Sequence, residues 1–192
     1  MAERSGSAQP VLLFVRGSAD PNSPMPMVGD PGSTLLWTSR PGPMGRGMPV
    51  IAPDGHQLML GEFLMSTGKA EVECTGRGTR SELHYKHLIP NATYTVWQLA
   101  FDATGNLLAI GALGPNDGSR NSFHSSSNGE GELSTTTPAG PLSMFGSLGA
   151  CALDQFDLVY ALAYHIDGMT HGPTPGPDGT YAEQNTFDFR RR

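Results

Sequence analysis

From residue 57 onward, short apolar and β-branched segments recur along the chain, with glycine, proline, Asn and Asp turns between them. The clearest segment is 93–101, TYTVWQLAF, which is rich in residues that favour strands. Residues 69–74 alternate, with Ala, Val and Cys on one face and Lys and Glu on the other. Regularly spaced strands of this kind predict an all-β fold, a Greek-key or immunoglobulin-like β-sandwich of about nine or ten short strands.

The remaining strands are expected where similar runs lie between turns. Two turns stand out: residues 102–105, and Asn128-Gly129, which predicts a hairpin between its two flanking strands. A short helix is the expectation for residues 141–148. Strands are expected at 57–65, 81–88, 106–113, 119–126, 132–137, 156–166 and 186–190.

The first 56 residues differ from the rest in composition. Short apolar runs at 11–16 and 33–38 favour strands, but segments 21–27 and 40–49 are rich in proline, glycine and methionine. Proline lacks the backbone donor that a strand ladder needs, and glycine weakens strand interiors. We therefore expect an irregular N-terminal arm, residues 1–56, packed on a β-sandwich domain, residues 57–192.

The charge pattern argues against two classes of partner. The formal net charge is −6, and the twelve Lys and Arg residues are scattered except for the last three residues. Nucleic-acid-binding proteins usually carry a basic face, which this pattern does not predict. No apolar run approaches the ~18–20 residues that span a bilayer, so we expect neither nucleic-acid binding nor a membrane span.

The cysteines and the polar start of the chain suggest an extracytoplasmic location. Residues 2–10 read like the beginning of a mature exported chain, although a cytosolic protein with a flexible N-terminus would look the same. The two cysteines, Cys74 and Cys151, fall at separate expected strands. In an exported β protein such a pair often forms one disulfide. The alternative is two buried free thiols.

A candidate metal site follows the apolar strand expected at 156–166. His165 and His171 lie six residues apart, and Asp167 lies between them. Imidazole and carboxylate groups suit copper or zinc, with Asp167 or His124 as the third ligand. Strand alternation directs His165 and Asp167 to one face, whereas the position of His171 depends on the loop. The alternative is a partly buried His165 bonded to the backbone and an exposed His171.

Other patterns carry less chemistry. His84 and His87 are three residues apart, so on a strand they point to opposite faces and do not pair as ligands. The methionines of the arm fit an apolar segment packed on the body better than a copper(I) site. No Gly-x-Ser-x-Gly nucleophile motif is present in the sequence, so no catalytic residue is assigned.

Three stretches carry a resemblance to known proteins: 88–97 (LIPNATYTVW), 131–138 (GELSTTTP) and 164–168 (YHIDG). They resemble secreted prokaryotic β-sandwich proteins of uncharacterised function, over about residues 70–189. More distantly the chain resembles immunoglobulin-like and copper/zinc superoxide dismutase-like sandwiches, although it lacks the His-x-His copper ligands of the latter. The resemblance implies the fold and export, and no activity.

These observations lead to three functional hypotheses. The first is a non-enzymatic extracytoplasmic module, structural or binding, with a protein or cell-surface partner. The second is a copper or zinc protein, a carrier or an enzyme, that uses His165 and His171. The third is a self-associating subunit joined by strand addition through the N-terminal arm.

Overall fold

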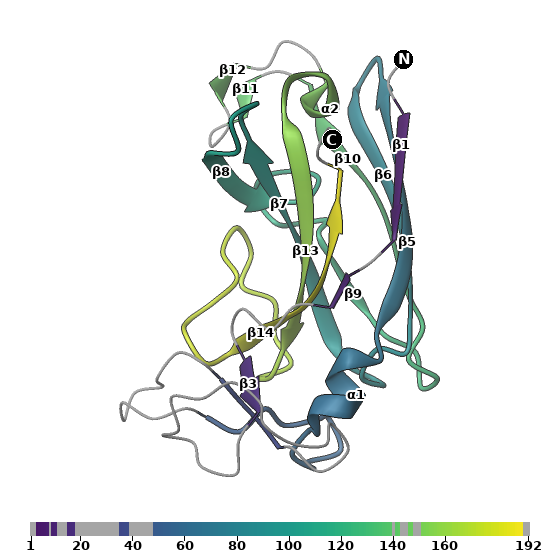
Figure 1. Ribbon diagram of the computed structural model, residues 1–192, viewed down its shortest axis with the longest axis vertical. Helices are drawn as coiled ribbons and strands as arrows, with labels where there is room; N and C mark the ends of the chain where they lie inside the picture. The colour runs from purple at the N-terminus through teal and green to yellow at the C-terminus, as the bar shows by residue number, and fades with distance from the viewer. Residues whose placement is uncertain are drawn as a thin grey trace.

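The computed structural model describes residues 3–7, 9–10, 15–17, 35–38, 48–139, 141–142, 146–147 and 151–189. Two antiparallel sheets face each other in a sandwich (Figure 1). One sheet has the order β1-β5-β6-β10, and the other has the order β2-β14-β13-β7-β8, with β9 also paired to β7. The predicted all-β sandwich is therefore confirmed.

The first sheet consists of β1 (Glu3–Ser7), β5 (Thr67–Thr75), β6 (Gly78–Lys86) and β10 (Gly131–Pro138). The second consists of β2 (Gln9–Pro10), β7 (Thr93–Phe101), β8 (Leu107–Ala112), β9 (Ser122–His124), β13 (Asp157–His165) and β14 (Tyr181–Asp188). The chain passes from β6 to the second sheet and returns as β10, which pairs with β6. This return is a Greek-key type of connection.

Strand β13 lies in the middle of its sheet, between β7 and β14. Its last six residues, Tyr160 to His165, are all buried. A strand buried on both faces reads as a continuous apolar run, which is why it was predictable from the sequence. Its C-terminal residue, His165, therefore emerges from the most enclosed part of the sheet.

Aromatic rings fill much of the space between the sheets. Tyr85 of β6 and Tyr94 of β7 each stack on Phe123 of β9, with centroid distances of 5.5 Å in both cases. These three rings form a continuous stack that joins the two sheets. Offset and stacked aromatic pairs contribute about 0.5–1.5 kcal/mol beyond their area burial. The stack therefore fixes the short strand β9 firmly on the body.

Parts of the N-terminal arm complete the two sheets. Strand β1 pairs with β5, and β2 pairs with β14, both antiparallel. Strands β3 (Val15–Gly17) and β4 (Leu36–Thr38) pair with each other. Leu36 and Val50 are fully buried, so this segment contributes to the core. Much of the predicted arm, including segments 21–27 and 40–47, lies outside the described residues.

The strand expected at residues 57–65 is wrong. Only isolated bridges form at Gln57 and Met59, and helix α1 (Leu60–Leu64) follows. The Glu62 side chain accepts a hydrogen bond from the Met59 backbone N–H at 2.7 Å, which satisfies one of the free donors at the helix start. The spacing of Leu60 and Phe63, both buried, suits one helical face.

Two further expectations are corrected. The described parts of segment 141–148 are strands β11 (Pro141–Leu142) and β12 (Gly146–Ser147), which pair with each other, so the expected helix is wrong there. A one-turn helix, α2 (Ala152–Gln155), lies just beyond that segment. The turn at Asn128-Gly129 is present, with Gly129 N–H bonded to Ser126 O at 3.0 Å, but its flanking strands pair elsewhere. Strand β9 pairs with β7, and β10 pairs with β6, so no hairpin forms.

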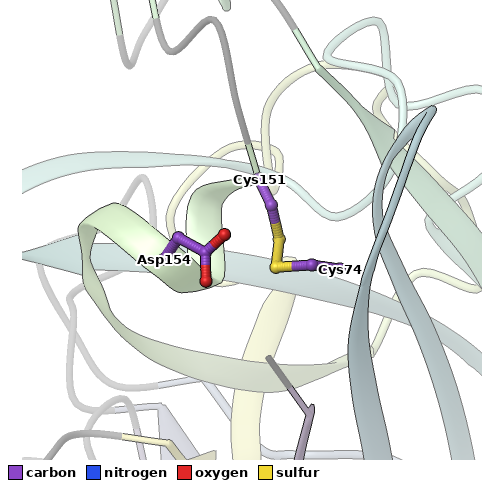
Figure 2. A group of neighbouring side chains, drawn as sticks. All are labelled: Cys74, Cys151 and Asp154. Carbon is purple, nitrogen blue, oxygen red and sulfur yellow. A yellow bond between two sulfur atoms is a disulfide. The ribbon is translucent and has the colours of Figure 1, made fainter. Parts of the chain in front are cut away.

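Cys74 of β5 and Cys151, at the start of α2, form the predicted disulfide (Figure 2). The bond joins residues 77 positions apart, and the Cα atoms are 5.5 Å apart. It ties the first sheet to the segment that leads into β13. Among the described residues, no helix is long and apolar enough to cross a membrane.

Candidate metal centre

The three predicted metal ligands converge where β13 ends. One ligand atom each from His165, Asp167 and His171 lie within 4.8 Å of one another. Ligand atoms that share a tetrahedral zinc ion lie roughly 3–4 Å apart, because each is about 2 Å from the metal. Small side-chain movements would therefore bring the three groups onto one ion.

The loop after β13 returns His171 to the strand end. Its base is closed by the Ile166 N–H, which donates to Thr180 O at 2.8 Å. Part of the loop packs on the turn that contains Gly118, because a Cβ atom at Gly118 would collide with the backbone of Gly172. The loop is thus closed at its base and held at its side. These contacts position His171, which the sequence alone left undetermined.

His165 is the buried member of the site, with 1% of its surface exposed. Its Nε2 atom lies 2.7 Å from the Thr95 hydroxyl oxygen, which also accepts a hydrogen bond from Trp97 Nε1 at 2.8 Å. Its Nδ1 atom is buried and has no hydrogen-bond partner among the described residues. Burial lowers the pKa of His165 to about 4, and His171 adds to this shift while Asp167 opposes it. The imidazole is therefore neutral at physiological pH, as a metal ligand must be.

The contact with Thr95 is compatible with either tautomer of His165, and one of them leaves Nδ1 free to bind a metal. If Nε2 carries the proton, it donates to Thr95, and Nδ1 presents a buried lone pair. Metal-bound imidazoles usually donate their other N–H to a nearby acceptor in this way. An unpaired buried polar atom destabilises the fold by about 1–3 kcal/mol. A metal ion at Nδ1 would remove that penalty.

Asp167 and His171 form the more accessible side of the site. The Nε2 atom of His171 lies 3.0 Å from Oδ2 of Asp167, and these side chains are 20% and 22% exposed respectively. The imidazole rings of His165 and His171 are 5.8 Å apart between centroids. Two imidazoles and one carboxylate are thus gathered on one side of the sheet end. This set matches catalytic zinc sites and non-haem iron sites, which leave coordination positions open.

A hollow of about 500 Å³ adjoins the site. Its lining includes two of the three candidate ligands, His165 and Asp167. The other lining residues come from the 51–55 turn, the start of β7, β9 and the end of β13: Ile51, Ala52, Pro53, Gly55, Asn91, Ala92, Thr93, His124, Tyr164, Ile166 and Gly168. The Tyr164 hydroxyl donates to Ile51 O, so one wall is anchored to β13.

His124, the alternative third ligand, stands beside the site and is not a member of the three-residue group. Its Nδ1 atom lies 3.2 Å from the Thr93 hydroxyl oxygen. That hydroxyl donates its proton to Gly168 O at 2.9 Å. Thr93 therefore links His124 to the turn that carries Asp167.

His56 belongs to a separate cluster. Its Nδ1 atom lies 2.5 Å from Asp54 Oδ1, and its Nε2 atom lies 3.1 Å from Glu62 Oε1. Hydrogen bonding to Asp54 is the main cause that raises the pKa of His56. Because both ring nitrogens are used by carboxylates, this imidazole is suited to an ion-pair role. It ties the 51–57 turn to helix α1.

Two other groupings do not support metal binding. Asp154 lies beside Cys74 and Cys151, but both sulfur atoms are used in the disulfide (Figure 2). A metal-binding cysteine would have to be a thiolate. His84, 60% exposed in its side chain, pairs with Glu132 at 3.3 Å. His165, Asp167 and His171 remain the metal candidates among the described residues.

The fold and the disulfide define a two-sheet, disulfide-bonded β-sandwich protein. No protein-family model matches the chain, and a search of curated proteins found no match. The two packed sheets confirm the sandwich fold that the resemblance implied. A relationship to secreted prokaryotic or immunoglobulin-like proteins stays a prediction.

Proposed function

We propose that this protein is an extracytoplasmic β-sandwich module that binds one transition-metal ion, zinc or copper(II), through His165, Asp167 and His171. The observation that carries the proposal is the convergence of the three ligand atoms within 4.8 Å, one of them contributed by a fully buried histidine. The proposal combines the extracytoplasmic module expected from the sequence with a specific ligand, a metal ion. Imidazole and carboxylate ligands suit both ions, and copper(II) is expected to bind more tightly.

The unpartnered Nδ1 atom of His165 gives independent support. Most buried side-chain polar atoms are hydrogen-bonded, and among the described residues His165 Nδ1 and Gln98 Nε2 are nitrogen atoms without such a partner. The Thr95 hydroxyl holds Nε2 and leaves Nδ1 on the free side of the ring. A bound cation would satisfy that nitrogen. The alternative expected from the sequence, a His165 side chain bonded to the backbone, is not supported, because the side chain contacts the Thr95 hydroxyl.

The extracytoplasmic location is proposed on the disulfide. Disulfides persist in oxidising compartments and are rare in the reducing cytosol. Cys74 and Cys151 should therefore not react with an alkylating reagent when cells are quenched in acid before lysis, because their sulfur atoms are joined in the disulfide. Quantitative alkylation of both cysteines would contradict this location.

Metal titration of the untagged, chelator-treated protein tests the binding proposal. We expect one equivalent of Zn²⁺ or Cu²⁺ by calorimetry and by elemental analysis after dialysis. His171→Ala should weaken binding more than about 100-fold, since even partners that only orient ligands change affinity by about 10–100-fold. His84→Ala, an exposed histidine elsewhere, is the matched control and should bind normally. Absence of stoichiometric metal would refute the proposal.

The strand-addition hypothesis stays a prediction. Strands β1 and β2 of the arm are paired within the chain. Those pairings use the described strands of the arm internally, so they do not favour intermolecular strand exchange. Metal binding is therefore the function that the described residues support best.

A further inference from the structure

We propose that the hollow beside the metal centre binds a small hydroxyl-bearing ligand, a phenol or an alcohol with an apolar body, whose oxygen atom coordinates the metal while His124 accepts its hydrogen bond. This inference rests on the proposed metal function and deepens it by naming a ligand class. It depends on three observations: the incomplete ligand set, the fixed tautomer of His124 and the chemistry of the hollow.

Among the described residues, three ligands form the group around His165. Zinc and copper(II) usually take at least four, so one or more positions remain for solvent or an added ligand. His165 and Asp167 both line the hollow of about 500 Å³. Binding sites for small molecules are commonly concave spaces of about 300–1,000 Å³. The hollow is therefore the space from which an additional ligand can reach the ion.

The hydrogen-bond network assigns the role of His124. A hydroxyl group has one proton, and that of Thr93 is donated to Gly168 O. The Thr93 oxygen can then only accept from His124, so Nδ1 of the neutral imidazole carries the proton. The Nε2 atom is left as an acceptor. A partner of His124 must therefore provide a donor, as a hydroxyl does and an ionised carboxylate does not.

Part of the lining of the hollow is aliphatic. Ile51, Ala52, Pro53 and Ala92 all line it, and no Lys or Arg is among the described residues that line it. Apolar walls with a few polar groups are typical of sites for small organic molecules. The hollow is therefore of mixed character, and its aliphatic part can pack against the apolar body of a ligand. A phenol combines such a body with a hydroxyl that a bound metal would make more acidic and that would donate to Nε2 of His124.

The test uses the Cu²⁺-loaded protein with 4-methylphenol and acetate as probes. We expect 4-methylphenol to produce a visible charge-transfer band from copper-bound phenolate, and acetate at the same concentration to compete poorly. His124→Ala should weaken binding of 4-methylphenol about tenfold, the loss of one hydrogen bond of about 1.4 kcal/mol, without changing the affinity for Cu²⁺. Thr93→Val, which releases the imidazole, should act in the same direction. His84→Ala should leave both affinities unchanged.

The possible outcomes separate the two proposals. If Cu²⁺ does not bind, the metal function itself fails. If Cu²⁺ binds normally but 4-methylphenol gives no band, or binds equally well to the His124→Ala variant, the hollow proposal is overturned and the metal function stands. Stronger binding of acetate than of 4-methylphenol would also overturn the hollow proposal.

Discussion

Gly176 lies directly against the imidazole ring of His171: a Cβ atom at Gly176 would fall 2.5 Å from Cδ2 and 2.8 Å from Nε2 of that ring. The backbone there has φ +102°, a conformation that L-residues rarely adopt. Glycine is thus required on two grounds, the space for the ring and the backbone geometry. Gly176 acts as a positioning residue for the most loop-dependent ligand of the metal centre.

Replacing Gly176 with alanine should displace His171 from Asp167 and His165. We expect Gly176→Ala to reduce Zn²⁺ affinity about tenfold or more, comparable to the loss of a group that orients a ligand. Gly55→Ala is the matched control, because Gly55 has φ +94° and no atom of the described residues lies within 4 Å of its Cβ position. Both variants carry similar backbone strain, so only the first should change the affinity in a competition titration. Equal effects of the two variants would show that strain alone is responsible.

The Thr95 hydroxyl should matter for both stability and metal binding. Thr95→Val leaves His165 Nε2 and Trp97 Nε1 without their shared partner, which should lower the free energy of unfolding by about 1–3 kcal/mol. Zn²⁺ affinity should fall about 10–100-fold, because His165 loses the group that orients it. Thr95→Ser retains the hydroxyl and should restore most of the affinity. If Thr95→Ser binds Zn²⁺ as weakly as Thr95→Val, the hydroxyl has no such role.

The disulfide should stabilise the fold without tuning the metal centre. Cys151 precedes β13 and His165 ends it, so the two sites are separated by the length of a nine-residue strand, roughly 30 Å. The double variant Cys74→Ser, Cys151→Ser should lose about 2–4 kcal/mol of unfolding free energy in urea titration. Its Zn²⁺ affinity, measured well below the unfolding transition, should match that of the wild type. A large loss of affinity in the folded variant would contradict this separation.

The His56 cluster predicts a pH dependence of stability. Its raised pKa means that the folded chain holds the proton more tightly than the unfolded chain. Its contribution is therefore full below the ordinary value of 6.5 and decreases as pH rises through the raised pKa. Asp54 has the opposite sign: hydrogen bonds to His56 lower its pKa, so its contribution is lost as the pH falls below about 4.

Urea unfolding of metal-free protein between pH 6 and pH 9 tests this dependence. In the His56→Gln variant the decline of stability across that range should be smaller than in the wild type. His84→Gln, in which an exposed histidine is changed at a distant strand, is the control and should follow the wild-type curve. A His56→Gln curve parallel to that of the wild type would show that the ion pairs of His56 do not cause the pH dependence of stability.

The sequence predicts the strands well where one feature, local alternation or continuous burial, decides the outcome. Strand β7 has the predicted bounds, and β5, β10 and β13 differ from prediction by a few residues at their ends. Strand partners are a different matter, because pairing depends on contacts distant in sequence. The Asn128-Gly129 turn forms as expected, yet the strands beside it join different sheets.

The metal centre shows the same division. The pair His165 and Asp167 could be placed from the strand that precedes them, but His171 could not. Its position results from the closed loop base, the contact of Gly172 with Gly118 and the space left by Gly176. The role of Thr95 was also hidden, because it needs the register that places Thr95 beside Ala163, two residues before His165. The helix at 60–64 lacks the usual cap signal, because Met59 at its N-cap has no side-chain oxygen, although Glu62 three residues later accepts from the Met59 N–H.

The ring stack of Tyr85, Phe123 and Tyr94 has a consequence for recognition. Phe123 is the neighbour of His124 in the chain, so the residue that faces the hollow is carried by a strand whose adjacent side chain is clamped between two sheets. The backbone of His124 is thus already ordered before any ligand arrives. Association then loses little conformational freedom on this side, and more of the contact energy appears as affinity. The Phe123→Leu variant, which breaks the ring stack, should accordingly bind the ligand more slowly and more weakly, even though Phe123 does not line the hollow.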